Sequence, residues 1–433
     1  MTMTRRSVLA GAAALGLARP AAAADVDVAV IGAGAAGIGA ARELVRAGRS
    51  VVVLEARDRV GGRVHTDASL GPAFDAGAVY IHWAERNPWK AIADELKVPL
   101  EEEPWGQPPL VFRNGTRLSE AERQRRRGGF GRVWSAVEQT GADRSFADAV
   151  RAAAPEALDA AAGMTLFALG EDPQRVSVQD YQDLWSGDDY LVPSGYGALV
   201  ARAGEGLPVR LSTPVAAIRW DGPAIALETP RGTLTAHHVV LTVPVGVLQA
   251  GGIRFTPELP AETRDALGGL GMGAYTKIAL RVDRRRIEPL ESTSYFELGD
   301  GGAATSYDFW PFDRDLVIAL AGGDHGRALC HAGEREAVAY ATDRLAAMIG
   351  GHARAAVTGG RLADWWTDPW SRGSYSIARP GRVAAREALR QPIGGRIHIA
   401  GEATAAGGGA MTVGGATLEG TRAARAILRG KSG

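Results

Sequence analysis

The sequence predicts an α/β fold in which a discontinuous, Rossmann-like dinucleotide-binding domain carries an inserted α+β domain. Three features support this prediction. A strand, a glycine-rich turn, a helix and a second strand follow one another between residues 26 and 55. Strand-like apolar runs recur much later, at Val239–Pro244 and Ile397–Ala403. An alanine-rich stretch with helical spacing and a stretch with strand-like alternation separate these segments.

The composition limits the possible functions. At 433 residues the chain is long enough for two or three domains. Its 49 basic and 49 acidic residues balance, so nothing indicates a nucleic-acid partner or an anionic membrane surface. Cys330 is the only cysteine, which excludes an intrachain disulfide and a thiolate zinc cluster, and we expect no metal.

The first 24 residues have the pattern of a targeting signal. Arg5 and Arg6 precede a short apolar stretch, and an alanine run ends at Ala24. This order predicts a twin-arginine signal peptide over residues 1–24, and therefore a periplasmic or secreted protein. The apolar stretch is shorter than the roughly 20 residues that a membrane span needs, so we expect no stable membrane insertion after cleavage.

The first element of the mature chain has the pattern of a dinucleotide site. A buried strand, Val26–Ile31, leads into Gly32, Gly34 and Gly37 in the spacing G-x-G-x-x-G, at the start of a helix over about 35–47. Gly32 permits a tight turn, Gly34 lets a pyrophosphate approach the backbone, and Gly37 lets helix and strand pack closely. The N-terminus of the helix favours the negative phosphates.

The second strand, over 50–54, ends on Glu55, where a carboxylate can accept a hydrogen bond from a ribose hydroxyl. Both NAD and FAD fit a unit of this kind. A second glycine pair follows in "ARDRVGGRV", which contains Gly61, Gly62 and Arg63. A second close approach of the backbone suits the longer FAD molecule, so the sequence favours FAD.

The stretch "MGAYTKIALRV" places a lysine in the middle of a predicted strand. Successive side chains of a strand point to opposite faces, so Lys277 and Arg281 share one face. Alternation alone predicts a half-buried strand with Lys277 on its solvent side, because lysine is rarely fully buried.

Four separated blocks, which together cover essentially the whole mature chain, resemble the flavin-containing amine oxidase family. This family includes monoamine oxidases, polyamine oxidases and flavin-dependent histone demethylases. The blocks are "LEARDRVGGRV" with its surroundings, "YLVPSGYGALV" through "VVLTVPVGVLQ", "MGAYTKIALRV", and "DWWTDPWSRGSYSIARPG" through the C-terminal "AGEATAAGGGAMTVGGATLEG". The resemblance implies an FAD-dependent oxidase that converts an amine into an imine and passes the electrons to dioxygen.

The resemblance also implies which residues contact FAD. Glu55 would hold the adenosine ribose, and the C-terminal glycine-rich turn would present free backbone N–H groups to the cofactor. The full set of implied cofactor residues is Gly32, Gly34, Gly37, Glu55, Arg57, Gly62, Arg63, Val79, Tyr80, Val215, Gly401, Glu402, Thr412 and Val413. Ser374 stands where animal monoamine oxidases have the cysteine that bonds to FAD, so we expect non-covalent FAD.

In the family, the lysine of the third block points at flavin N5 and holds a water there, which makes Lys277 a site lysine. Tyr375 matches one of the two aromatic rings that sandwich the amine in monoamine oxidases. The other ring position falls on Thr412, so the full aromatic sandwich is missing. Trp365 matches a tryptophan near the flavin, with plain core packing as the alternative. His82 would meet a substrate nitrogen or serve as a structural histidine.

The domain limits follow from this interpretation. The FAD domain is expected over 25–80, 190–270 and 380–433, and the substrate domain over 81–189 and 271–379. We expect the first part of the substrate domain to be helical and the second to supply its sheet. The acidic residues Asp183, Asp188 and Asp189 would steer polyamine cations or form a solvated loop.

The predicted function is oxidation of a small-molecule monoamine or polyamine, with Lys277 and Tyr375 as the catalytic residues and O2 as the acceptor. An L-amino-acid oxidase is an alternative that needs a cation for the substrate carboxylate, for which Arg281 and Arg314 stay open. A flavoprotein without turnover, such as an electron relay, is the alternative from another class. A homodimer is also open.

Overall fold

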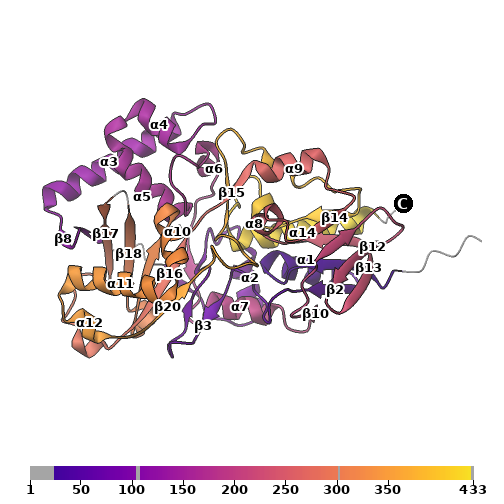
Figure 1. Ribbon diagram of the computed structural model, residues 1–433, viewed down its shortest axis with the longest axis horizontal. Helices are drawn as coiled ribbons and strands as arrows, with labels where there is room; N and C mark the ends of the chain where they lie inside the picture. The colour runs from indigo at the N-terminus through magenta and orange to yellow at the C-terminus, as the bar shows by residue number, and fades with distance from the viewer. Residues whose placement is uncertain (1–23, 104–107, 301–302, 431–433) are drawn as a thin grey trace, which may run out of the picture.

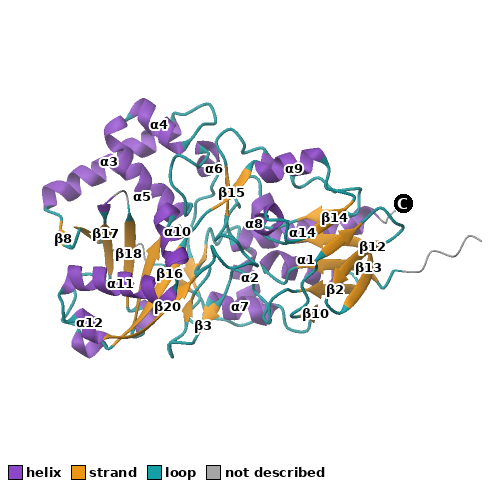
Figure 2. Cartoon of the chain, viewed as in Figure 1, coloured by secondary structure: helices purple, strands orange, loops and turns teal. Residues whose placement is uncertain are grey.

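The computed structural model describes residues 24–103, 108–300 and 303–430. The predicted signal peptide lies outside the described residues except for Ala24. Within these ranges, every helix is too short or too polar to cross a bilayer. Two β-sheets organise the chain, one toward each end of the long axis, with loops and short strands between them (Figures 1 and 2).

The first sheet is mixed and takes strands from distant parts of the chain. Its order is β10-β2-β1-β13-β12-β11-β14, and β22 pairs with β13. The pairs around β1 are parallel, whereas β12 runs antiparallel to both of its neighbours. The strands are β1 (Val26–Ile31), β2 (Val51–Leu54), β10 (Val209–Arg210), β11 (Ala217–Arg219), β12 (Ile225–Thr229), β13 (Gly232–Leu241), β14 (Arg254–Thr256) and β22 (Ile397–Ile399).

The first and last long helices pack together on this sheet. α1 (Ala35–Arg46) follows the glycine turn, and α14 (Val413–Gly430) is the last helix of the described chain. A Cβ on Gly420 would lie 1.9 Å from the backbone oxygen of Ala36, so glycine is required where the two helices touch. The predicted Rossmann-like unit is confirmed, with β1 where it was expected and α1 and β2 shifted by one residue at an end.

The second sheet has the order β20-β16-β19-β18-β17-β7-β8 and is antiparallel except where β7 pairs with β17. Leucine, valine and alanine side chains of α11 (Glu334–Ile349) pack on one of its faces. The strands are β7 (Leu110–Arg113), β8 (Thr116–Arg117), β16 (Thr276–Val282), β17 (Ser294–Leu298), β18 (Ala304–Phe309), β19 (Leu316–Ala321) and β20 (Val357–Ala363).

Two expectations for this region were incomplete. The segment expected to be helical does contain helices, but it also supplies β7 and β8 to the sheet. The segment expected to supply strands also contains α10 (Gly323–Ala332) and α11, because its alternating apolar run stops at Ala321. The helices of the first segment are α2 (Pro88–Glu95), α3 (Glu120–Glu138), α4 (Phe146–Ala153), α5 (Leu158–Ala168) and α6 (Val178–Gln182). The domain limits themselves stay a prediction.

Short elements join the two sheets. β15 pairs with β21, and β9 pairs with both β5 and β6. Figure 1 shows β15 in the region between the two sheets, and its pairing with β21 places the segment around residue 376 there as well. Their bounds, with those of the remaining helices, are β3 (Thr66–Asp67), β4 (Phe74–Asp75), β5 (Tyr80–Ile81), β6 (Glu101–Glu102), β9 (Tyr190–Leu191), β15 (Leu270–Met272), β21 (Ser376–Ala378), α7 (Tyr196–Ala203), α8 (Val245–Gln249), α9 (Ala261–Gly268), α12 (Ala353–Ala356) and α13 (Ala385–Ala388).

Candidate active site

The three glycines of the first turn have different reasons to be glycine. Gly32 has φ +103°, which favours glycine. A Cβ on Gly37 would lie 1.9 Å from the oxygen of Gly32, so this position needs glycine for packing. A Cβ on Gly34 would meet nothing within 4 Å. Gly34 is also the N-cap of α1 and has no side-chain capping bond among the described residues. The open space at Gly34 thus lies at the start of α1, where no described side chain caps the backbone N–H groups.

Glu55 closes this turn from the end of β2. The side chain is buried, and its carboxylate accepts hydrogen bonds from the backbone N–H groups of Ala33 (2.7 Å) and Arg57 (2.8 Å). A carboxylate has about four lone-pair directions, so these two bonds leave acceptor capacity for a ribose hydroxyl. Glu55 therefore fits both a structural role in the loop and the predicted ribose contact.

The second glycine pair lies against the first turn. Gly61 donates its N–H to Ala33 O (2.8 Å), and a Cβ on Gly62 would lie 3.4 Å from Gly34 Cα. The two predicted arginines extend from this loop. Arg57 makes a two-pronged ion pair with Asp368 (both 2.8 Å), and its guanidinium lies 5.8 Å from the Trp365 ring.

Lys277 lies in the interior, not on a solvent face. Only 6% of its surface is exposed, and the ammonium donates to the backbone oxygens of Asp75 (2.8 Å) and Gly77 (2.5 Å). The wet-face expectation from alternation is therefore wrong: both faces of β16 are covered as far as Leu280, and only Arg281 is exposed. Burial lowers the pKa of Lys277 to about 8, against the opposing charges of Asp75 and Asp308.

Aromatic rings gather beside this strand. The Tyr375 and Tyr275 rings have centroids 6.3 Å apart, and the Phe167 ring meets Tyr275 edge to face. Burial, with the charge of Glu402, raises the pKa of Tyr375 well above its usual range, so the phenol stays neutral. Trp365 is buried and donates its indole N–H to Ala76 O (3.0 Å), one residue from the two carbonyls that hold Lys277.

The remaining predicted cofactor residues have varied environments. Glu402 is buried and accepts from Arg63 (3.0 Å) and from the Ser376 hydroxyl (2.7 Å). The Thr412 hydroxyl donates to Gly409 O (2.8 Å) and accepts from Gly415 N (3.0 Å), so it caps the start of α14 and its only proton is used there. Val413 is the first residue of that helix, Val215 is buried, Val79 and Tyr80 are half-buried, and a Cβ on Gly401 would meet nothing within 4 Å.

The aspartates of the acidic loop do not form one patch. Asp189 is buried and binds both His82 Nδ1 (3.0 Å) and the backbone N–H of Trp83 (3.1 Å). Asp183, by contrast, is exposed and lines a separate cavity. His82 is half-exposed beside Tyr80, with ring centroids 5.2 Å apart. Asp189 therefore holds the His82 ring in place, and steering by the three aspartates together has no structural support.

Sequence reasoning missed the carboxylate of Asp308, whose charge acts on Lys277. Asp308 faces Ile318, which faces Ala279, so Asp308 shares the sheet face of Lys277. Burial raises the pKa of Asp308 to about 6, with Lys277 opposing. Burial and the charges of Glu103, Asp308 and Asp189 raise the pKa of Tyr80 well above its usual range. The only sequence signal was an aspartate within an apolar strand.

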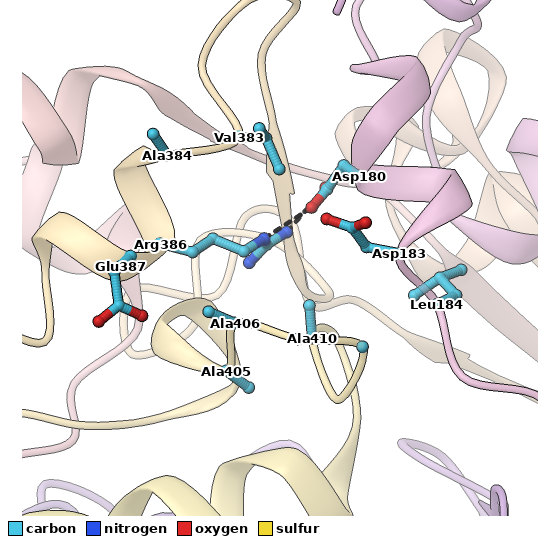
Figure 3. Close-up of a pocket in the computed structure, with 12 residues that line it drawn as sticks. Asp180, Asp183, Leu184, Val383, Ala384, Arg386, Glu387, Ala405, Ala406 and Ala410 are labelled. Carbon is cyan, nitrogen blue, oxygen red and sulfur yellow. Dashed lines mark hydrogen bonds and ion pairs between the residues drawn. The ribbon is translucent and has the colours of Figure 1, made fainter. Parts of the chain in front are cut away.

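Sequence reasoning also missed a buried ion pair that contacts Ser376, the residue after Tyr375. Arg386 and Asp180 form a two-pronged pair (2.7 and 2.8 Å) and are almost completely buried. They line a cavity of about 200 Å³, into which Asp183 also points (Figure 3). A larger cavity of about 520 Å³ is lined by Trp366 and Met272, among other residues. Neither cavity contains Lys277 or Tyr375, so both flank the site and do not form it.

These residues fit the dinucleotide cofactor that the sequence indicates. Open space at Gly34 and Gly401, the uncapped start of α1 and the adjoining Gly61–Gly62 loop suit a pyrophosphate. Arg63 of the adjoining loop bridges Glu402 and the backbone oxygen of Ser374, the residue before Tyr375. The Arg63 backbone oxygen accepts from Ala78 N (3.2 Å), next to the Gly77 carbonyl that holds the lysine ammonium. The fold and site therefore define an α/β protein whose glycine turn suits a dinucleotide and whose second sheet carries a buried lysine.

The chain belongs to the flavin containing amine oxidoreductase family, whose sequence model matches residues 35–177 and 156–428. Human lysine-specific histone demethylase 2 is 27% identical over 439 residues, which cover 93% of this chain and 53% of the demethylase. This chain thus spans about half the length of that relative. Polyamine oxidase 4 of rice (Oryza sativa subsp. japonica) is 27% identical over 89% of this chain and 85% of the relative.

Solved structures agree on the fold. A variant of putrescine oxidase matches with a TM-score of 0.77 at 22% identity, over 94% of this chain and 99% of that chain. Wild-type putrescine oxidase with bound putrescine matches with a TM-score of 0.77 at 23% identity, over 93% and 99% of the two chains. The predicted architecture, a Rossmann-like mixed sheet beside a mainly antiparallel sheet, is therefore confirmed.

Proposed function

We propose that this protein is an FAD-dependent amine oxidase that turns a primary or secondary amine, water and dioxygen into an aldehyde, an amine or ammonia, and hydrogen peroxide. FAD, when bound, takes the hydrogen and electron pair from the carbon beside the nitrogen and passes them to dioxygen. The observation that carries the proposal is the buried Lys277, whose ammonium is held by the carbonyls of Asp75 and Gly77. Two residues earlier in the chain, the Tyr275 ring lies 6.3 Å from that of Tyr375.

Lys277 has a chemical role that its environment supports. Two of its three N–H groups are used by Asp75 O and Gly77 O, and the third has no acceptor among the described residues. In a site closed to bulk water, this third N–H can hold a water molecule or stabilise negative charge that develops on dioxygen. Tyr375 would present a neutral ring against which the amine is positioned.

We propose that FAD is bound without a covalent link. Ser374 precedes Tyr375, and its hydroxyl donates to Gly273 O (2.9 Å), so it serves the backbone. Cys330, the only cysteine, is buried in α10, and burial raises the pKa of its thiol to about 12, which keeps it unreactive.

The carboxylates near Lys277 favour a substrate with two cationic groups. A diamine can place its reacting, neutral nitrogen beside Tyr375 while the distal ammonium pairs with ionised Asp308, supported by Glu103 and Asp189. The relatives named polyamine oxidase and the putrescine-bound neighbour support the same substrate class.

The amino-acid alternative has less support. Its substrate carboxylate needs an available cation near Tyr375. Arg281 is exposed at the end of β16, and the Arg314 guanidinium donates to the carbonyls of Ala73 and Pro193. A flavoprotein without turnover would not require the buried Lys277. The proposed export to the periplasm or medium rests on the N-terminal sequence alone.

Hydrogen peroxide release tests the proposal. Purified holoprotein is mixed with putrescine, a polyamine such as spermidine, benzylamine or L-amino acids, and peroxide is measured. The proposal predicts peroxide with the diamine or polyamine. Peroxide with amino acids only would establish the alternative oxidase, and no peroxide from any of them with FAD bound would favour the non-catalytic flavoprotein.

A further inference from the structure

The Arg386–Asp180 ion pair joins two segments that are 206 residues apart in the chain. The side chains are 3% and 2% exposed, so the pair is cut off from solvent (Figure 3). Asp180 also accepts from the backbone N–H of Ala378 (2.7 Å). Burying two charges costs as much as their attraction returns, so such a pair is weak evidence for stability. The other contacts of the pair point to a role besides stability.

Those contacts converge on Ser376, the residue after Tyr375. Arg386 donates to the Ser376 hydroxyl oxygen (2.8 Å) and to the Ser376 backbone oxygen (3.2 Å). The Ser376 hydroxyl in turn donates to Glu402 (2.7 Å), which also accepts the Ser376 backbone N–H. Every polar group of Ser376 is thus fixed by a charged side chain.

The residue before Tyr375 is held from the other side. Arg63 bridges Glu402 (3.0 Å) and the backbone oxygen of Ser374 (2.8 Å). The Ser374 hydroxyl accepts from Tyr275 N (3.0 Å) and donates to Gly273 O. Charged groups therefore clamp both neighbours of Tyr375, whereas no described residue is recorded as a hydrogen-bond partner of the Tyr375 side chain itself.

We propose that Arg386 and Asp180 are positioning residues that set the orientation of the Tyr375 ring through Ser376 and Glu402. This inference rests on the proposed function for its catalytic consequence, because it takes Tyr375 as the ring that orients the amine. The orientation itself is a property of the fold and is measurable without any reaction. Small misplacements of an orienting group lower rates strongly.

The experiment neutralises the pair without leaving a lone buried charge. In the double variant Arg386→Met/Asp180→Asn, the asparagine oxygen still accepts from Ala378 N. The matched control is Arg344→Met/Glu297→Gln, which neutralises another pair with a buried carboxylate, on α11 and β17, away from Tyr375. Glu297 also accepts a backbone N–H, from Gly115, so the two double variants change the same kinds of contact.

Fluorotyrosine NMR of the holoprotein measures the Tyr375 environment directly. The chain has nine tyrosines, and Tyr375→Phe assigns the relevant fluorine signal. We expect the Tyr375 signal to shift or broaden in the Arg386→Met/Asp180→Asn variant and to stay unchanged in the control. An unchanged signal in the first variant, or the same change in both variants, would overturn the positioning role whether or not the protein oxidises amines.

A double-mutant cycle tests the consequence for catalysis. Neutralising the Arg386 pair should lower kcat/KM by about tenfold or more, and by less than about threefold when Tyr375→Ala is already present. An equal loss in both backgrounds would show general damage and would contradict action through Tyr375. If the parent protein oxidises no amine, the proposed function fails, and the NMR result alone decides the positioning role.

Discussion

Replacing Lys277 with methionine tests the role of the buried ammonium. The substitution keeps a long side chain in β16 and removes the charge. Lowering a lysine pKa from 10.5 to about 8 corresponds to about 3 kcal/mol, which is the cost of holding the charged form inside the fold. Methionine removes this cost. It also leaves the carbonyls of Asp75 and Gly77 without their donor, at about 1–3 kcal/mol each.

These two effects have similar size and opposite sign, so we expect Lys277→Met to fold and to retain FAD. Loss of a preorganised charge at a reacting group typically lowers a rate by about 10²–10³-fold. Stopped-flow spectroscopy measures reduction of the flavin by an amine without oxygen, and then its reoxidation after mixing with oxygen. At least one of these steps should slow by that factor.

The pH dependence of the reaction rate gives a second test of the Lys277 ammonium. The ammonium of Lys277 is lost as the pH rises through about 8, so in the parent protein the lysine-dependent step should slow above that pH. Lys277→Met should lack this dependence. Lys97→Met, at an exposed lysine just after α2, is the control and should match the parent. Rates of both half-reactions within about threefold of the parent would refute the role of Lys277.

Three further predictions follow from other parts of the site. Asp308→Asn should raise KM for diamines by about tenfold or more and leave KM for monoamines little changed. In the parent protein, KM for diamines should fall as the pH rises through about 6, because Asp308 ionises there. An equal effect of Asp308→Asn on KM for both substrate classes would contradict the distal-ammonium role. Gly34→Ala should fold normally but lose FAD, because its Cβ enters only the open space of the turn. The flavin absorbance per protein measures FAD occupancy, and full occupancy would contradict a pyrophosphate site in that space. Gly37→Ala should instead lower the melting temperature, measured by scanning calorimetry, because its Cβ meets the Gly32 oxygen, and an unchanged melting temperature would refute this packing constraint.

The dinucleotide unit was predictable because its information is local. Strand, turn, helix and acid follow one another within about 30 residues, and each glycine has a reason that its spacing already implies. The structure confirms β1 and α1 to within one residue. Local patterning also located the helical segment that contains α4 and α5.

The burial of Lys277 was not predictable from its strand. Alternation along β16 assigns faces, but it cannot show whether a second layer covers a face. Here that layer is the segment around Asp75–Gly77, about 200 residues earlier, whose carbonyls hold the ammonium. Only the resemblance to a family with a lysine in this strand suggested the correct environment.

The carboxylates and the buried ion pair escaped prediction for the same reason. Asp308 is on β18, and the register with β19 and β16 decides that it shares the face of Lys277. Asp180 and Arg386 stand in two short helices, and they meet only because the fold brings α6 and α13 together. Pairings over such separations leave no local pattern in a single sequence.

The most direct test of the central claim is anaerobic titration of the purified holoprotein with a panel of amines, polyamines and amino acids. The flavin absorbance is followed as each compound is added. We predict that the flavin is bleached by diamines or polyamines, and that admission of oxygen restores the absorbance with formation of hydrogen peroxide. A flavin that stays oxidised with every amine of the panel would contradict the assignment as an amine oxidase.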